Sequence, residues 1–446
     1  MSAVAADLSG IVGAEFVRED IELTDASGMR GSASVLTSPG TAEEVAAVVA
    51  WAYERDLAIV PVGGSTGYSG GIVPEVDAPA VAIALHRLDR VRSFEPRLWR
   101  AEVEAGVTTA TVARLARNEG LMFGPDPGAA QTSQIGGNLA TNAGGPHAFG
   151  YGVISQWVTG IEAVLAPGEL ARFGGPIRKD VAGYDLKSLL IGSEGTLGVI
   201  TAAWLRLAPA PEQELVVYAV YDSVEAGVEA VHSALGSGAA LGAVEFLQGT
   251  SLRHSPPPFL DSPAGEFLVI CETHSRADQD KLLAALGSSA SAVEADVVWG
   301  WRKGVSLVVR AVKGEKIAED ISVPLDRLGD AIRATMEIGE AHGLEATSWG
   351  HAGDGNIHST YLFDPNDPDQ VRRAELAAED LFDLARSLGG SVSGEHGIGK
   401  LKRGQLAGQW SDVAVRAHEA VKDALDPKGL FNPGTKEPRP DLAGER

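Results

Sequence analysis

Histidine and carboxylate side chains gather in two glycine-rich segments of the chain. One segment reads WGHAGDGNIH and the other, about forty residues later, reads SGEHGIGK. His351, His358 and Glu395 form a two-histidine, one-carboxylate set that commonly holds a catalytic divalent metal and leaves positions open for substrate. The remaining imidazole, His396, is then free to act as a general base. The alternative is two unrelated histidines in a hairpin, but the second segment favours the metal site.

A cationic group precedes these segments. Arg302 and Ser306 are four positions apart in WRKGVS, a spacing that puts both on one face of a helix. Arginine is the natural bidentate partner of a substrate carboxylate. A surface arginine paired with an acid is an equally good interpretation of the same residues.

Extended segments must bring the two histidines together. Asp354-Gly355 lies between His351 and His358 and predicts a tight turn with an extended arm on each side. Long helices are predicted on either side of this hairpin, over residues 325–342 and 369–388.

Glycine clusters mark the first half of the chain. A helix over 41–55 and a strand over 57–62 lead into GGSTGYSGG at 63–71. It belongs to a loop over 61–71 whose backbone N–H groups could cradle a phosphate. The loop matches neither the Rossmann nor the P-loop pattern, and a turn-rich connection explains it equally well. Two further clusters, in the loop-rich stretch 121–152 and at 191–201, favour a large dinucleotide ligand.

Composition restricts the class of protein. The 446 residues predict two to three domains, and a net charge of −23 disfavours nucleic acid and anionic membranes as partners. The single cysteine, Cys271, lies in an apolar run and is expected to be inert. No secretory signal or membrane-spanning segment is visible, so the cytoplasm is the expected location.

A second domain is predicted after the proline-rich break at 209–212. Beyond it, strands alternate with helices in an α+β pattern. The predicted strands cover 215–220, 242–246 and 266–271, and the predicted helices cover 223–235 and 278–286.

Taken in order, the motifs resemble those of the FAD-linked D-2-hydroxy acid dehydrogenases, within the vanillyl-alcohol-oxidase (p-cresol methylhydroxylase-type) flavoproteins. The resemblance runs from about residue 30 to residue 436. Its most specific parts are GGSTGYSGG, GGNLATNAGG, KDVAGYDLKSLLIGSEGTLGVIT, HAGDGNIH, SGEHGIG and FNPGTK. It implies an α+β fold: a two-subdomain FAD-binding domain, a ferredoxin-like α+β cap domain for substrate, and a C-terminal segment that returns to the flavin. The corresponding boundaries are 1–30 for an N-terminal helical segment, 31–209 for the FAD domain, 210–425 for the cap and 426–446 for the C-terminal segment.

The resemblance assigns a role to each candidate residue. His351, His358 and Glu395 match the metal ligands, with zinc expected first and manganese second. His396 matches the catalytic base, and Arg302 is counted with it as catalytic. The positions that match substrate-contacting groups are Arg302, Ser306, Asn356 and Thr360. The positions that match contacts of a non-covalent FAD are Pro61, Val62, Gly63, Gly64, Ser65, Thr66, Gly67, Tyr68, Ser69, Pro125, Asp126, Ser133, Gly136, Gly137, Asn138, Thr141, Asn142, Gly144, Glu194, Gly195, Gly198, Ile200 and Asn432.

Two departures from the family pattern have consequences. Some relatives that act on 2-hydroxyglutarate carry a lysine at the position that matches Ala318 of this chain, and Lys316 is out of register with that position. A small monocarboxylate is therefore the expected substrate. The 61–71 loop contains no histidine, so no covalent flavin link is expected.

The resemblance implies oxidation of a small, anionic D-2-hydroxy acid, D-lactate or glycolate, to the 2-oxo acid. Electrons would pass from FAD to a separate acceptor: a quinone, an electron-transfer flavoprotein or a cytochrome. The alternatives are a D-2-hydroxyglutarate dehydrogenase of the same family and a flavin-dependent transferase that resembles alkyl-dihydroxyacetone-phosphate synthase. A homodimer is compatible with the sequence, and an acceptor in a membrane would give peripheral attachment there.

Overall fold

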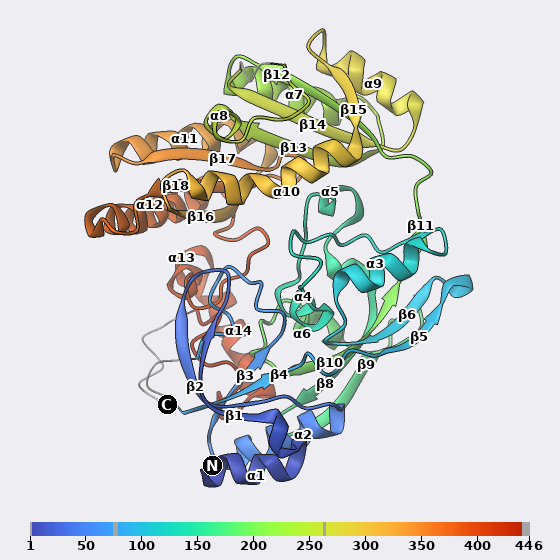
Figure 1. Cartoon of the computed structure of the whole chain (residues 1–446), viewed down its shortest axis with the longest axis vertical. Coiled ribbons are helices and arrows are strands. Elements are labelled where there is room, and N and C mark those ends of the chain that lie inside the picture. Colours follow the sequence, from blue (N-terminus) through green and yellow to red (C-terminus); the bar gives the residue numbers. More distant parts are fainter. Residues whose placement is uncertain (1, 75–78, 262–264, 439–446) are drawn as a thin grey trace. The chain divides into compact units, whose positions relative to one another are not determined.

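A computed structural model describes residues 2–74, 79–261 and 265–438 (Figure 1). Contacts within the chain divide it into two units. The first comprises Met1–Gly145, Gly152–Ala210 and Glu395–Arg446, and the second comprises Pro146–Tyr151 and Pro211–Gly394. Both mix helices with sheets, as the α+β prediction requires. Within the described ranges, no helix is both long and apolar enough to cross a membrane.

The ends of the chain differ from the expected division. Helix α1 (Ala3–Val12) is followed by strand β1 (Val17–Thr24), so the N-terminal segment is helical only in its first half. The chain rejoins the first unit at Glu395, well before residue 426, because the backbone N–H groups of Ile398 and Gly399 donate to Glu194 of that unit. Residues 439–446 of the expected C-terminal segment lie outside the described residues.

The first unit contains a four-stranded sheet in the order β1-β2-β4-β3. Its parallel strands β2, β4 and β3 carry alanine, valine and isoleucine, and are covered on one face by α1 and α2. Helix α2 and strand β3 confirm the helix and strand predicted ahead of the glycine loop. The bounds are β2 (Arg30–Thr37), α2 (Ala42–Glu54), β3 (Ala58–Val62) and β4 (Ala80–Ala84).

A five-stranded sheet in the order β5-β6-β10-β8-β9 completes this unit, with every pair antiparallel. Two short strands, β7 and β11, pair separately. The bounds of these strands and of the remaining helices are β5 (Val91–Glu95), β6 (Arg100–Glu104), α3 (Thr109–Arg117), β7 (Leu121–Met122), α4 (Ile135–Thr141), β8 (Val158–Leu165), β9 (Glu169–Gly174), α6 (Leu186–Leu190), β10 (Val199–Arg206), β11 (Ala208–Pro209), α13 (Leu406–Gln409) and α14 (Asp412–Leu425).

Ion pairs between arginines and buried carboxylates cross the five-stranded sheet. Arg92 on β5 reaches Glu104 on β6 over 3.2 Å and Glu162 on β8 over 2.9 Å. Arg172 on β9 also pairs with Glu162, at 2.9 Å. Burial would raise the pKa of Glu162, but the hydrogen bonds and charge of Arg92 outweigh it and hold that pKa below its ordinary value. The sheet is thus joined by charge across strands that are distant in sequence.

The glycine-rich stretch predicted as loop contains a helix. Gly136, Gly137, Asn138 and Thr141 lie in α4, which ends where Asn142 takes a left-handed conformation with φ of +53°. A Cβ on Gly136 would lie only 2.7 Å from Cβ of Ala105. Close packing of this helix against the chain beyond β6 therefore outweighs the low helix propensity of glycine.

The second unit is built on a seven-stranded sheet in the order β15-β12-β14-β13-β17-β18-β16. Strands β12 to β15 give the order of a ferredoxin-like fold, and β16, β17 and β18 repeat its first three strands. The two halves meet edge to edge through β13 and β17, which run antiparallel. The strands are β12 (Leu215–Tyr221), β13 (Leu241–Gln248), β14 (Phe267–Thr273), β15 (Ser291–Glu294), β16 (Glu315–Ser322), β17 (Glu345–His351) and β18 (Asn356–Phe363).

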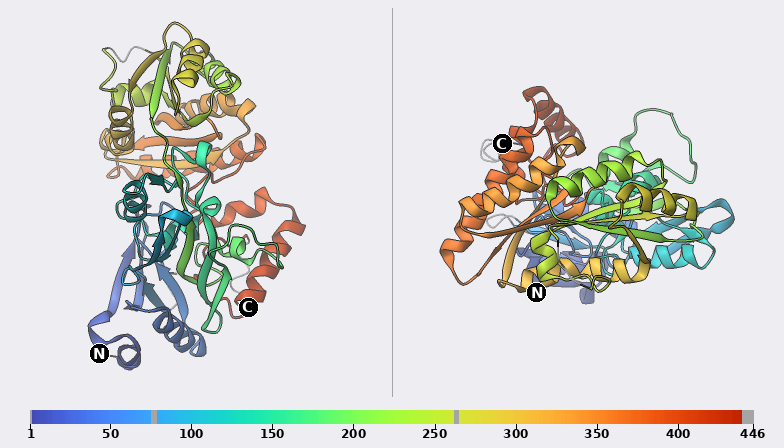
Figure 2. Two further views of the ribbon diagram at one scale, coloured as in Figure 1. Left: turned by 90° about the vertical axis from the view of Figure 1, so that its right-hand side faces the viewer. Right: turned by 90° about the horizontal axis from the view of Figure 1, so that it is seen from above.

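Helices cover both faces of this sheet (Figure 2). One face packs against α7, α9, α11 and α12, and the other against α8 and α10. The bounds are α7 (Val224–Gly236), α8 (Gly249–His254), α9 (Arg276–Leu286), α10 (Ala295–Ala311), α11 (Leu328–Ala341) and α12 (Pro368–Ser387), with α5 (Ala148–Tyr151) beside β13. The predicted strands and helices of this part of the chain are confirmed. All candidate substrate residues lie on the face covered by α8 and α10, or on α10 itself.

Candidate metal and substrate site

The predicted hairpin brings His351 and His358 together. Strands β17 and β18 pair antiparallel with Trp349 opposite His358, and the turn passes through Gly355 at a φ of +77°. His351 is two positions from Trp349, so both imidazoles lie on the same face of the sheet. Their ring centroids are 5.3 Å apart, and both side chains are buried.

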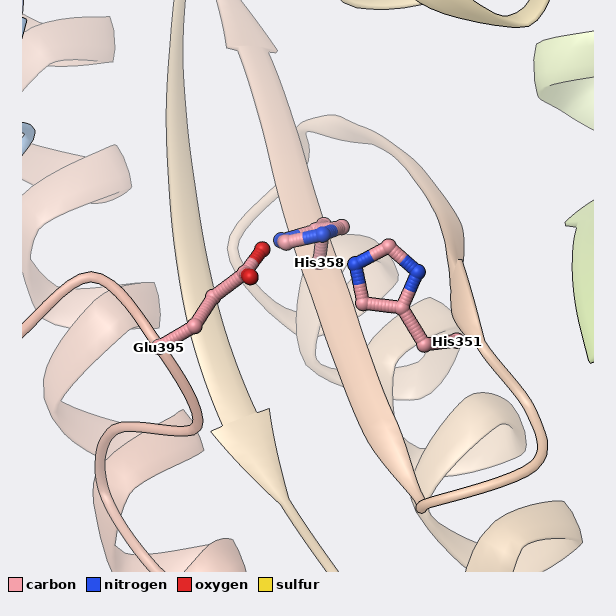
Figure 3. Close-up of side chains that lie close together, drawn as sticks. All are labelled: His351, His358 and Glu395. Carbon is pink, nitrogen blue, oxygen red and sulfur yellow. The ribbon is translucent and has the colours of Figure 1, made fainter. Parts of the chain in front are cut away.

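Glu395 joins the two histidines from the following loop. The loop is attached to β16 because Ser391 bridges Ser322 and the Gly394 N–H donates to the oxygen of Asp320 over 3.3 Å. Glu395 is the next residue, and its carboxylate points toward both rings (Figure 3).

The three side chains fit a divalent metal. One ligand atom from each of His351, His358 and Glu395 lies within 4.8 Å of the other two. Two borderline imidazole nitrogens with one hard carboxylate oxygen form a donor set that suits zinc and similar divalent ions. Among the residues that the structure describes, no other group of three or more His, Cys, Asp or Glu side chains converges in this way.

Glu245 on β13 connects the metal cluster to Arg302. Its carboxylate is fully buried, contacts Nδ1 of His351 and accepts from Nε of Arg302 over 2.8 Å. Nη2 of Arg302 lies 2.7 Å from the same carboxylate oxygen. Sequence reasoning missed Glu245, although an acid inside the predicted strand 242–246 is an unusual residue for a buried position.

Arg302 is buried on α10 and is therefore not a surface arginine. It does pair with an acid, and that pairing uses Nε and Nη2. In the described part of the chain, Nη1 has no hydrogen-bond partner. The pairing thus orients the guanidinium and leaves one nitrogen to receive an anion.

Ser306, one helical turn beyond Arg302, accepts a hydrogen bond from Lys316 over 2.9 Å. Lys316 lies two positions before Ala318 on β16, and alternation along the strand puts both on the face that carries His358. Its ammonium lies 4.8 Å from the ring centroid of Trp349. Burial lowers the pKa of Lys316 to about 8, and no carboxylate of the described residues lies within ion-pair distance of it. Lys316 therefore enters the candidate site despite its shifted position.

Asn356 and Thr360 lie beside the histidines on β18, and both are buried. Oδ1 of Asn356 has no hydrogen-bond partner among the described residues. A buried acceptor without a partner is costly, and a ligand donor would satisfy it. Thr360 donates to the backbone oxygen of His358 over 3.4 Å, so its hydroxyl is already engaged.

His396, the expected base, belongs to the first unit. Its ring stacks on Tyr68 of the glycine loop, with centroids 4.7 Å apart. Half of the Tyr68 side chain remains exposed. The base candidate and one cofactor candidate are thus neighbours, and the next residue back along the chain is the ligand candidate Glu395.

The glycine loop that follows β3 packs closely against the segment before α4. A Cβ on Gly63 would lie 3.3 Å from Cα of Gly137, and one on Gly64 would collide with the oxygen of Thr132. Oε1 of Gln134 is buried and has no partner among the described residues. A cradle of small residues with an unsatisfied acceptor fits a large, polar ligand such as FAD.

Asn432 links three of the predicted cofactor segments by hydrogen bonds. Its side-chain amide donates to the oxygen of Gly71 over 2.7 Å and to that of Glu194 over 2.8 Å. Its own Oδ1 is buried and lacks a partner within the described ranges. Gly195 lies against Pro61. Three candidate cofactor segments therefore contact one another: the loop 61–71, the turn at 194–195 and the C-terminal segment.

Other cofactor candidates are occupied with local structure. Ser133 and Asn138 bond to each other and to Thr109, and Thr141 bonds within α4. Asn142 accepts from the N–H of Ser155, and Ile200 is buried within β10. The rest lie along the three glycine clusters: Val62, Ser65, Thr66, Gly67, Ser69, Pro125, Asp126, Gly136, Gly144 and Gly198.

His147 lies in the loop-rich stretch 121–152 but belongs to the second unit. Its Nε2 lies 3.2 Å from Glu272 on β14, which also accepts from Trp299 over 2.6 Å. Burial would raise the pKa of Glu272, but the hydrogen bonds from His147 and Trp299 leave it below its ordinary value. Glu272 is thus a second buried acid on the face that carries Glu245.

Comparison with known proteins gives matches over most of the chain. The model for the C-terminal domain of FAD linked oxidases matches residues 210–435, and the model for an FAD binding domain matches residues 33–174. The glycolate oxidase subunit GlcD of Bacillus subtilis (strain 168) is 32% identical over 92% of this chain and 90% of its own. The D-2-hydroxyglutarate dehydrogenase of Xanthomonas citri pv. viticola is 32% identical over 89% and 87%. The D-lactate dehydrogenase of Anaerostipes hadrus is 29% identical over 90% and 88%.

Solved structures share the fold at lower identity. p-Cresol methylhydroxylase with substrate bound gives a TM-score of 0.79 at 17% identity, over 97% of this chain and 96% of that one. An alkyldihydroxyacetonephosphate synthase gives 0.75 at 17% identity, over 97% and 84%. These likenesses show the architecture expected from the sequence.

Proposed function

This chain belongs to the FAD linked oxidases, and on that premise we propose that it oxidises a D-2-hydroxy acid to the 2-oxo acid with FAD. The electrons would then pass to a separate acceptor. One observation carries the proposal: Glu245 connects a guanidinium to a cluster of two histidines and a carboxylate on one sheet face. A 2-hydroxy acid presents a carboxylate for the guanidinium and a hydroxyl for the metal cluster.

Residues of the second unit, with Glu395 and His396 that follow it in the chain, would bind and orient the substrate. Arg302 would hold the substrate carboxylate through Nη1, and Asn356 would present its buried Oδ1 to a substrate hydroxyl. His351, His358 and Glu395 would hold a divalent metal, with zinc expected before manganese. His396 would take the hydroxyl proton at a ring nitrogen. When bound, FAD supplies the electron-accepting chemistry and the metal polarises the hydroxyl.

The residues of the first unit would bind FAD without a covalent bond. Gly63 and Gly64 would allow its phosphates to approach the backbone, and Gln134 and Asn432 would offer their unsatisfied acceptors. The names of the relatives support 2-hydroxy acids as the substrate class, because glycolate, D-lactate and D-2-hydroxyglutarate share the same reacting group.

Two observations bear on substrate size. Ala318 leaves room where a family lysine would stand, which supports glycolate or D-lactate. Lys316, however, brings an ammonium without an acid partner to Ser306. Lys316 therefore supports D-2-hydroxyglutarate as a second candidate substrate, because its ammonium could pair with the distal carboxylate of that acid.

A panel of substrates tests the proposal. The purified flavoprotein is mixed without oxygen with glycolate, D-lactate, L-lactate and D-2-hydroxyglutarate, and the visible absorbance of the flavin is followed. At least one of the achiral or D acids should bleach the flavin, and L-lactate should not. An unbleached flavin with the whole panel would reject 2-hydroxy acid oxidation. It would leave the transferase, which forms no net reduced flavin, as the better candidate.

A further inference from the structure

We propose that Glu245 is the positioning residue that couples the metal cluster to the substrate-carboxylate clamp. The inference rests on the proposed function, because it assigns Glu245 a task within that same site. Glu245 itself is expected to touch neither the metal nor the substrate. It would act through His351 on one side and Arg302 on the other.

The first step is the position of Glu245 in the sheet. It lies directly opposite His351 in the pairing of β13 with β17. Cross-strand partners project on the same face at close range. The contact between Glu245 and Nδ1 of His351 is therefore built into the register of the two strands.

The second step is the orientation of the His351 ring. When Nδ1–H donates to the Glu245 carboxylate, Nε2 carries the lone pair. Figure 3 shows one ring nitrogen of His351 turned toward His358 and Glu395 and the other turned away. A carboxylate on the outer nitrogen of a ligating histidine fixes its tautomer and raises its basicity.

The third step is the cation that balances Glu245. A fully buried carboxylate is unfavourable unless it is paired and hydrogen-bonded. Arg302 supplies that pairing at 2.8 Å and 2.7 Å from a single oxygen, while the other oxygen serves His351. The two carboxylate oxygens are thus divided between the two functional groups, and neither group can shift without disturbing the other.

The test is Glu245→Gln, measured first as metal affinity. The amide can accept from one partner only, and its NH2 group opposes the donor of the other. Metal affinity, determined by chelator competition on the flavoprotein, should fall by about 10- to 100-fold, as expected when an outer partner of a ligand is lost. With metal in excess, the KM for the best hydroxy acid should still rise, because Arg302 has lost its anchor.

Glu272→Gln is the matched control. Glu272 is also buried, lies on the neighbouring strand and faces the same side, but it bonds His147 and Trp299 instead. Its substitution should leave metal affinity unchanged. If Glu245→Gln fails to fold, Glu245→Asp keeps the charge but is too short to reach both partners, and it should show an intermediate loss.

Wild-type metal affinity in a folded Glu245→Gln or Glu245→Asp protein would overturn the inference. Equal losses in the Glu245 and Glu272 variants would also overturn it, since a general loss of core stability would then be sufficient. Neither result concerns the flavin reaction itself. A wild-type protein that binds metal but bleaches with no hydroxy acid would instead refute the proposed function.

Discussion

Asn432 donates a hydrogen bond to the backbone oxygen of Glu194 over 2.8 Å, although 238 positions separate the two residues. The same amide donates to Gly71, so Asn432→Asp would set carboxylate oxygens against two carbonyls. We expect this variant to lose about 1–3 kcal/mol of unfolding free energy. Urea titration measures the loss, and the flavin content of the purified protein should fall with it. Asn432→Gly, which keeps the positive φ of +44° without strain, should lose less. Equal losses would show that loss of the two hydrogen bonds is sufficient and that repulsion from a carboxylate adds nothing.

Removal of a metal ligand should empty the metal cluster. His358→Gln should weaken metal binding by more than the roughly 10–100-fold expected for loss of an outer partner. Metal content is measured by mass spectrometry after dialysis. The control is His254→Gln, since His254 bonds Glu345 outside the cluster and its loss should not alter metal content. Unchanged metal in His358→Gln would exclude the assigned ligand set.

His396→Ala should lower turnover while leaving both cofactors bound. Loss of a general base typically costs about a hundredfold or more in rate. The visible spectrum and the metal content should match those of the wild type. His418→Ala is the control, because its ring packs on Trp410 instead of Tyr68. Wild-type turnover in His396→Ala would assign proton removal to another group.

Lys316→Met should change the choice of substrate. If its ammonium pairs the distal carboxylate, kcat/KM for D-2-hydroxyglutarate relative to D-lactate should fall about tenfold or more. Lys313→Met, which removes a partly exposed lysine, should not change that ratio.

The charge of Lys316 also predicts a pH dependence. Burial lowers its pKa to about 8; nearby Glu315 raises the pKa and Arg310 lowers it. The ammonium is therefore present below about pH 8 and is lost above it. The preference for the dicarboxylate should decline as pH rises through 8 in the wild type and should be absent in Lys316→Met. A ratio that does not respond to pH or to the substitution would rule out Lys316 as a substrate contact.

Acid should weaken the five-stranded sheet through Glu162. Its pKa is lowered in the folded state, so its stabilisation is present above its unfolded pKa and is lost as pH falls through the folded pKa. Glu162→Gln should cost about 1–3 kcal/mol at neutral pH, because it removes one of the two buried carboxylates that pair with Arg92 and the carboxylate that pairs with Arg172. The difference in unfolding free energy between wild type and Glu162→Gln should shrink as pH falls below about 4.5. Urea unfolding midpoints of the two proteins at neutral pH and below about pH 4.5 measure this difference. A difference that does not change with pH would contradict the linkage.

Much of the candidate site could be predicted from residue type and local spacing. The Asp354-Gly355 turn predicted a hairpin, and the hairpin fixes which face His351 and His358 share. Arg302 and Ser306 follow from helical spacing. These features depend on neighbours in the chain, so the sequence displays them directly.

The features that were missed depend on pairing between distant segments. Glu245 reaches His351 only because β13 pairs with β17, and about a hundred residues of the chain separate these two strands. Lys316 is two positions from Ala318 and therefore does not match the family lysine in sequence, yet two positions along a strand return to the same face. Gly136 has the residue type of a loop position, but its close approach to Ala105 explains why glycine stands there in a helix. Register and packing, which no local pattern contains, decided all three.

The edge-to-edge joining of two similar half-sheets has a consequence for the independence of the parts. The half that ends with α10 carries Glu245 and Arg302, and the half that begins with β16 carries His351 and His358. A fragment cut between Ala311 and Glu315 would therefore hold either the clamp or the two imidazoles, never both. Only three residue pairs join the strands at this seam. Catalysis at this site thus requires that the two half-sheets, each with its own core strands, stay paired through β13 and β17.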